Sequence, residues 1–194
     1  NHVYILKETG EIVDNCQKRP QRLFEERELS VDECAGYLQK AINLLKSQTA
    51  ASGSSEGSLK VIITVSPIRY AKYGYHGSQL SKATLLLAAD KLVKENPGVV
   101  SYFPAYEIMN DELRDYRFYK EDMLHPSEQA VEYIWERFRA TYFGKAAELF
   151  LEDWRPIREA LGHKPFHPES EEHQKFIART EEKKRQFEEK YHLL

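Results

Sequence analysis

The chain has 194 residues, of which 41% are hydrophobic and 30% are charged, and its formal net charge is −3. This balance is typical of one globular domain with a sizeable core, and the small acidic excess argues against a dedicated nucleic-acid surface. No apolar run approaches the roughly 20 residues of a membrane span, and the first residues lack the apolar segment of a signal peptide. The spacing of Cys16 and Cys34 does not require a disulfide. We therefore expect a reduced, cytoplasmic chain.

The first third of the sequence predicts one strand and one helix. Val3–Leu6 is a β-prone run, whereas residues 14–29 are polar and predict irregular structure. Ser30 and Glu33 have the spacing of a capping box, which predicts a helix that runs to about Lys46. The expected apolar face of this helix consists of Cys34, Tyr37, Leu38, Ala41 and Leu45.

The middle of the chain alternates between strand and helix patterns. The small residues of 47–58 predict a loop, and the β-branched run Lys60–Val65 predicts a strand buried on both faces, as in parallel sheets. A helix is expected from about 79 to 96, where Pro97 ends it, and Val99–Phe103 predicts a second strand. This order favours an α/β fold with right-handed crossovers.

The sequence is helical from Ser127 onward. An apolar stripe at helical spacing is formed by Val131, Ile134, Trp135, Phe138 and Tyr142. Gly144 is expected to interrupt this helix, and a last, highly charged helix covers about Glu169–Tyr191. Because its apolar positions are sparse, we predict an α/β domain over 1–163 and a helical C-terminal arm over 164–194.

Asp122 and His125 are the candidate catalytic residues. Three-residue spacing within one turn lets the carboxylate approach Nδ1–H of the imidazole, fix its tautomer and leave Nε2 free to accept a proton from a hydroxyl. Pro126 restricts His125 to an extended backbone, and Ser127 suits a helix N-cap. The same pair also occurs by chance or as a turn before a helix. A metal pair is a weaker alternative, because no further ligands lie nearby, so we expect no metal or cofactor.

Three further residues are candidates for substrate binding: Ser66, Arg69 and His76. Ser66 and Arg69 follow the strand at 60–65, and ligands of open α/β sheets bind at the carboxyl ends of strands. Arg69 suits an anionic or polyhydroxy substrate, with a structural ion pair to Glu107 or Asp111 as an equal alternative. His76 lies in a glycine-flanked segment that predicts a loop, where a solvent-facing role is the alternative.

Other polar and aromatic residues have simpler interpretations. Ser66 and Ser81 are weak candidates for a nucleophile, because neither lies in a Gly-x-Ser-x-Gly elbow. The tyrosines between 102 and 119 are explained by packing in the core or at its rim. An ion-pair network bracing the Asp–His loop is expected from Glu112, Arg114, Asp115 and Arg117.

Several blocks of the sequence together resemble the GSCFA family, a bacterial branch of the SGNH/GDSL hydrolases. The blocks that carry the resemblance are Thr9–Cys16 with Lys18 and Pro20, Thr64–Arg69, Gln79–Ala83 with Leu85–Leu87, Tyr102–Glu107, Asp111–Tyr119, Asp122–Ser127 and Trp135–Phe138. They cover nearly the whole chain. The block around Asp-x-x-His-Pro is the most specific. Gln17 departs from the family pattern, which has histidine there, so position 17 cannot be a base.

The resemblance implies a three-layer α/β/α (flavodoxin-like) fold with a parallel sheet. It also implies that His125 and Asp122 serve a serine within a Gly-Ser-Cys-Phe-Ala signature, which this chain does not contain. Asn1 would be the only remnant of an oxyanion-hole block. The expected activity is hydrolysis of an ester or acyl group on a small molecule, carbohydrate or lipid. The alternatives are a non-catalytic binding or structural member, an acyltransferase with the same residues, or a chain that is inactive on its own.

Overall fold

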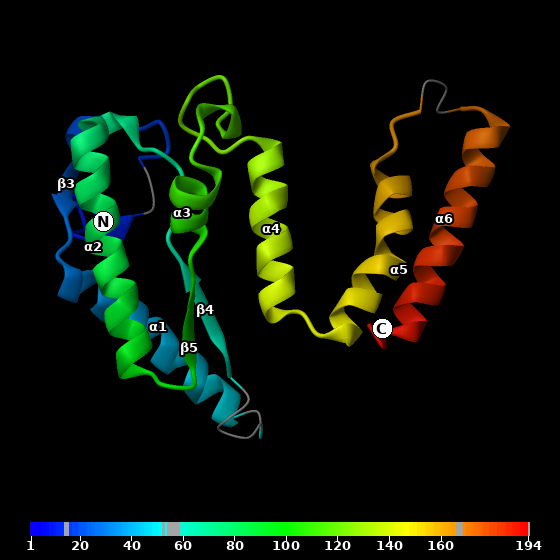
Figure 1. The fold of residues 1–194 in the computed structure, drawn as a ribbon, viewed down its shortest axis with the longest axis horizontal. Helices are drawn as coiled ribbons and strands as arrows, with labels where there is room; N and C mark the ends of the chain where they lie inside the picture. The colour runs from blue at the N-terminus through cyan, green and yellow to red at the C-terminus, as the bar shows by residue number, and fades with distance from the viewer. Residues whose placement is uncertain (14–15, 52, 54–58, 166–168, 194) are drawn as a thin grey trace. The chain divides into compact units, whose positions relative to one another are not determined.

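The computed structural model describes residues 1–13, 16–51, 53, 59–165 and 169–193. The chain divides into two compact units, Asn1–Trp135 and Glu136–Leu194. Figure 1 shows the elements along the chain. In order they are β1 (His2–Leu6), β2 (Ile12–Val13), η1 (Gln21–Leu23), β3 (Phe24–Glu28), α1 (Val31–Ala51), β4 (Val61–Thr64), η2 (Ala71–Tyr73), α2 (Gly74–Glu95), β5 (Val100–Phe103), α3 (Ala105–Glu107), the π-helical η3 (Ile108–Leu113), η4 (Tyr116–Phe118), α4 (Glu128–Tyr142), α5 (Lys145–Gly162) and α6 (Glu171–Lys190).

The first unit is built around a parallel strand pair, which confirms the mixed α/β class. β4 and β5 pair from Val61↔Val100 to Thr64↔Phe103, and α2 connects them (Figure 1). Across the described ranges the parallel sheet has these two strands. The expectation that β4 is buried on both faces is wrong, since Ile62 is 39% exposed while Val61 and Ile63 pack on the core. The reason is that, among described residues, α1 and α2 cover only one face.

A second, antiparallel sheet has the order β2-β1-β3. β1 confirms the predicted first strand. β3 was not expected, because residues 14–29 predicted irregular structure; residues 14–15 lie outside the described part of the chain. Its sequence Phe-Glu-Glu-Arg-Glu is nearly all charged, and only Phe24 is buried. β3 forms because its backbone pairs with β1 along the full strand, from His2↔Glu28 to Leu6↔Phe24.

The main core of the first unit lies between α1, α2 and β5. Its buried residues are Leu29, Cys34, Ala35, Ile42, Ala88, Leu92 and Val100. The capping box is confirmed, because Ser30 Oγ accepts from the Glu33 amide at 3.2 Å and Glu33 Oε2 accepts from the Ser30 amide at 2.9 Å. The predicted apolar face of α1 was partly wrong: Cys34 is buried, but Tyr37, Leu38 and Leu45 are exposed.

Two predicted helix boundaries were also wrong. α1 continues to Ala51, five residues into the expected loop, where Thr49 Oγ1 donates to the Leu45 carbonyl at 2.9 Å. The remainder of that loop, at residues 52 and 54–58, lies outside the described residues. α2 begins at Gly74 instead of about 79, so His76 lies in its first turn and not in a loop. Its end before Pro97 is as predicted.

The second unit contains α5 and α6, which pack against each other through aromatic side chains. Phe187 is buried against Phe150, Trp154 and Tyr191, with ring centroids 4.7–5.1 Å apart. Gly144 caps α5, as expected for a residue that interrupts the helix. None of the helices in the described residues is long and apolar enough to cross a membrane.

Candidate functional site

The Asp122–His125 segment lies in a closed loop between η4 and α4. Its two ends are held together by an isolated antiparallel bridge between Tyr119 and Pro126. Within the loop, the Lys120 amide donates to the His125 carbonyl at 2.8 Å, and the Met123 amide donates to the Lys120 carbonyl at 2.9 Å. Main-chain hydrogen bonds thus close the loop.

Both carboxylate oxygens of Asp122 are engaged. Oδ1 accepts from the main-chain amides of Leu124 at 2.8 Å and His125 at 3.0 Å. Oδ2 lies 2.6 Å from Nδ1 of His125. These bonds, led by those from the two backbone amides, lower the pKa of Asp122 to about 2. The carboxylate is therefore ionised at neutral pH and can only accept hydrogen bonds.

This geometry fixes the tautomer of His125. Because the Asp122 carboxylate only accepts, Nδ1 must carry the hydrogen, and in the neutral ring Nε2 is then left with its lone pair. Among the described residues nothing hydrogen-bonds to Nε2, and the side chain is 53% exposed. His125 thus presents an available basic nitrogen on an oriented ring.

The backbone of the loop adopts an uncommon conformation at Met123. Its φ is +59°, in the left-handed region that costs about 1–2 kcal/mol for a residue with a side chain. This turn lets two successive amides, of Leu124 and His125, point at one oxygen of Asp122. After the loop, Ser127 Oγ accepts from the Ala130 amide at 3.3 Å, as expected for the cap of α4.

Arg69, which follows β4, holds the loop from outside. Its amide donates to the Leu124 carbonyl at 3.0 Å, and its Nη1 donates to the Met123 carbonyl at 3.1 Å. Its guanidinium carbon lies 4.4 Å from the ring centroid of Tyr75 and 5.4 Å from that of Tyr119. Across the part of the chain that is described, Arg69 forms no ion pair, so the alternative of a pair with Glu107 or Asp111 is wrong. Glu107 instead accepts from the Tyr102 hydroxyl.

Within the described part of the chain, the hydrogen bonds of the other candidate residues do not involve His125. Ser66 Oγ accepts from the Ile68 amide at 3.3 Å, and Ser66 O accepts from the buried Lys82 ammonium at 2.6 Å. Burial lowers the pKa of Lys82. His76 is exposed in the first turn of α2. Neither Ser66 nor Ser81 hydrogen-bonds to His125 within the described residues.

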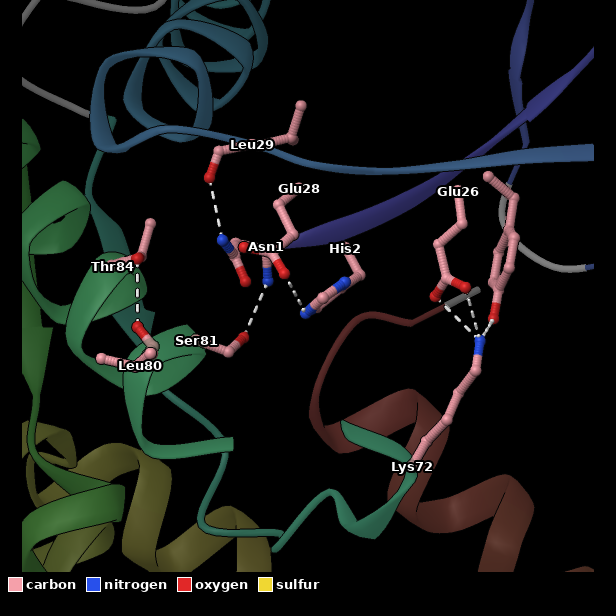
Figure 2. A network of polar contacts seen from close by, with 10 residues as sticks. Asn1, His2, Glu26, Glu28, Leu29, Lys72, Leu80, Ser81 and Thr84 are labelled. Carbon is pink, nitrogen blue, oxygen red and sulfur yellow. Dashed lines mark hydrogen bonds and ion pairs between the residues drawn. The ribbon is translucent and has the colours of Figure 1, made fainter. Parts of the chain in front are cut away.

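A separate polar network joins the antiparallel sheet to the segment after β4 (Figure 2). The Lys72 ammonium donates to the Tyr4 hydroxyl at 2.5 Å and to both carboxylate oxygens of Glu26 at 2.8 and 2.9 Å. These partners raise the pKa of Lys72. Figure 2 also shows Asn1, whose amino group donates to Ser81 Oγ at 3.1 Å and whose Nδ2 donates to the Leu29 carbonyl at 2.9 Å.

The expected ion-pair network before the loop is only partly formed. Arg117 pairs with Asp115 at 3.1 Å. The hydrogen bonds that Asp115 accepts from the Arg117 backbone amide and then from its guanidinium lower the pKa of Asp115. Arg114 has no ion pair or side-chain hydrogen bond to another described residue. It lines a pocket with Arg69, Tyr116 and Tyr119 that sequence reasoning missed. The signal in the sequence is the density of tyrosines between 102 and 119, for which packing is the simpler interpretation.

Fold and site together define a mixed α/β protein with an oriented aspartate–histidine pair at the start of a helix. The GSCFA family model matches residues 1–138, and a model for the C-terminal domain of GSCFA domain proteins matches residues 154–194. The chain belongs to the GSCFA family. Comparison with curated proteins and with solved structures found no match.

Proposed function

We propose that this protein is an ester or acyl hydrolase of the SGNH/GDSL type, in which Asp122 and His125 are the acid–base pair. The observation that carries the proposal is the 2.6 Å approach of Asp122 Oδ2 to His125 Nδ1, with Nε2 left unpartnered within the described residues. That arrangement has the chemistry that a serine-dependent hydrolase requires of its histidine. A three-layer fold completes the proposal.

The reaction follows from the protonation states of the pair. Nε2 of His125 accepts the proton of a serine hydroxyl as its oxygen attacks the ester carbonyl. The carboxylate of Asp122 stabilises the imidazolium that forms, and Nε2 then returns the proton to the leaving alcohol. Nε2 next accepts a proton from water, whose oxygen attacks the acyl-serine. The carboxylic acid is released and the serine recovers its proton from the imidazolium. The serine is proposed to precede Asn1, in line with the resemblance described above.

We also propose a substrate class, a cellular location and the bounds of two domains. The substrate is an ester on a small molecule, carbohydrate or lipid, near Arg69 and Ser66. The protein is proposed to be cytoplasmic and to bind no nucleic acid. The α/β domain is proposed to cover 1–163 and the helical arm 164–194.

The test is hydrolysis of p-nitrophenyl acetate by the full-length protein and its variants. His125→Ala should abolish turnover while the circular dichroism spectrum stays unchanged, because the variant lacks the Nε2 that accepts the serine proton. His192→Ala removes an exposed histidine beyond α6 and serves as the matched control. Equal turnover by the His125 variant and the control would rule out the pair as catalytic. Absence of turnover and of labelling by a serine-directed fluorophosphonate would favour a non-catalytic member of the family.

A further inference from the structure

A pocket of about 260 Å³ lies in the first unit beside the Asp122–His125 loop. The residues of its wall that matter here are Arg69, Gln79, Asn110, Arg114, Tyr116 and Tyr119. Arg69 belongs both to the pocket and to the loop, because its Nη1 donates to the Met123 carbonyl. This volume is slightly below the roughly 300 Å³ at which the range of small-molecule pockets begins, so the pocket suits one ring or one charged group.

The two arginines of the pocket lack full electrostatic compensation. Arg69 contacts neutral groups: a carbonyl and three tyrosine rings, of which Tyr116 is 5.8 Å away. Arg114 has no charged partner among the described residues. The one acid of the wall, Asp115, accepts two hydrogen bonds from Arg117, from its amide at 2.9 Å and its guanidinium at 3.1 Å. The pocket therefore carries a net positive charge that suits an anion.

The position of Arg114 results from an unusual backbone. η3 is a π-helical turn, and Arg114 follows it with a φ of +48° and an amide that donates to the Met109 carbonyl at 3.1 Å. π-helical turns and left-handed residues with side chains cost free energy that the surrounding structure must offset. They occur frequently at functional sites. Met109 is almost completely buried, which anchors this turn.

The neutral groups of the pocket add directed hydrogen-bonding capacity. Gln79 Oε1 accepts from the Tyr106 hydroxyl at 2.5 Å, so the amide nitrogen of Gln79 remains a donor. Asn110 Nδ2 donates to the Tyr106 carbonyl at 2.7 Å, which leaves Oδ1 as an acceptor. Tyr116, which is 64% exposed, adds an aromatic ring to the wall. Cationic, donor, acceptor and aromatic groups thus converge on one small site.

We propose that this pocket binds an anionic group of the substrate, a carboxylate or a phosphate, through Arg114 and Arg69. This inference rests on the proposed function, because it takes the bound molecule to be the substrate of the Asp122–His125 pair. An anion bound by Arg69 therefore contacts the same side chain that donates to the Met123 carbonyl of the loop. Substrate binding and orientation of the loop then share one side chain.

The proposal is tested by binding, without turnover. Three sugars that share one ring but differ at carbon 6 are titrated into the 194-residue chain and followed by nuclear magnetic resonance: glucose, glucuronate and glucose 6-phosphate. We expect at least one charged sugar to bind at least tenfold more tightly than glucose. Arg114→Gln should reduce that affinity about tenfold, the loss typical of a charge-assisted hydrogen bond. Arg22→Gln removes the same charge from an exposed residue outside the pocket and should leave the affinity unchanged.

The outcomes separate this inference from the hydrolase proposal. Equal affinities for the three sugars, or equal affinities of the Arg114 and Arg22 variants, would overturn the anion site. If glucuronate alone binds tightly the group is a carboxylate, and if glucose 6-phosphate alone does so it is a phosphate; either result supports the site. His125→Ala should bind the charged sugar as the unchanged chain does. Full turnover of p-nitrophenyl acetate by His125→Ala in the full-length protein would refute the catalytic pair and leave the binding result standing.

Discussion

Asp122 binds His125 twice, once through the backbone and once through the ring. Oδ1 accepts from the His125 amide at 3.0 Å, while Oδ2 lies 2.6 Å from Nδ1 of the same residue. The carboxylate therefore fixes both the chain position and the ring orientation of the histidine.

The first prediction concerns the tautomer. In Asp122→Asn the side-chain oxygen can still accept the two backbone amides, but the amide nitrogen then faces Nδ1 and donates to it. The neutral ring should change to the Nε2–H form, which nitrogen chemical shifts of His125 in the 194-residue chain will report. In the full-length protein we expect ester hydrolysis to fall by on the order of 10⁴. A variant that keeps the Nδ1–H form would contradict this interpretation.

The second prediction is a pH dependence. The pKa of Asp122 is lowered to about 2 in the folded chain from 3.8, so its contribution to stability is present above about pH 4 and is lost as the pH falls toward 2. The carboxyl carbon of Asp122 should titrate with a midpoint near 2. Asp122→Asn should remove this part of the acid sensitivity of unfolding. A midpoint at the ordinary aspartate value would show that the backbone bonds do not form in solution.

The third prediction concerns Met123, which has a φ of +59° and a side chain that is 43% exposed. Glycine adopts this conformation without steric cost, although its greater freedom in the unfolded chain offsets part of the gain. We expect Met123→Gly to raise the free energy of unfolding by about 0.5–1 kcal/mol in urea titrations. Met123→Leu keeps the strain and serves as the control. Destabilisation by glycine relative to leucine would count against a strained loop.

The fourth prediction concerns Arg69 as a brace. Arg69→Met keeps much of the apolar stem but removes the bond from Nη1 to the Met123 carbonyl and the contacts to the tyrosine rings. Because Arg69 is only half-buried, we expect a loss of about 1 kcal/mol. Hydrogen exchange should quicken at the amides of Leu124 and His125. Arg22→Met is the control, and equal exchange rates in both variants would exclude the bracing role.

The fifth prediction concerns the core between α1 and α2. Leu92 is completely buried, and Leu92→Ala should cost about 2–5 kcal/mol in the free energy of unfolding. Leu80 lies on the same helix but is 57% exposed, so Leu80→Ala should change it by less than about 0.5 kcal/mol. Similar losses in the two variants would contradict the packing described for this helix.

The features that the sequence predicted well are local. The capping box of Ser30 and Glu33 and the contact between Asp122 and His125 each span three residues, so spacing alone restricts the geometry. The class of the fold followed from the β-branched runs on either side of an uninterrupted helix.

The features that the sequence did not predict depend on distant partners. β3 is a strand only because its backbone pairs with that of β1, although most of its side chains are charged. The buried face of α1 contains Ile42 in place of Tyr37 and Leu38, since several stripes of this helix are apolar and only its neighbours select one. The contact of Arg69 with Met123 joins residues 54 positions apart, which no spacing rule could supply.

The bridge between Tyr119 and Pro126 has a consequence for evolution of the loop. The two ends of the loop are joined by this bridge, so the backbone between them cannot accommodate an inserted or deleted residue without breaking hydrogen bonds. One residue corresponds to a shift of about 3.5 Å along the chain, which exceeds the tolerance of a hydrogen bond. The segment from Asp122 to His125 should therefore accept substitutions of its two middle residues far more readily than any change in its length.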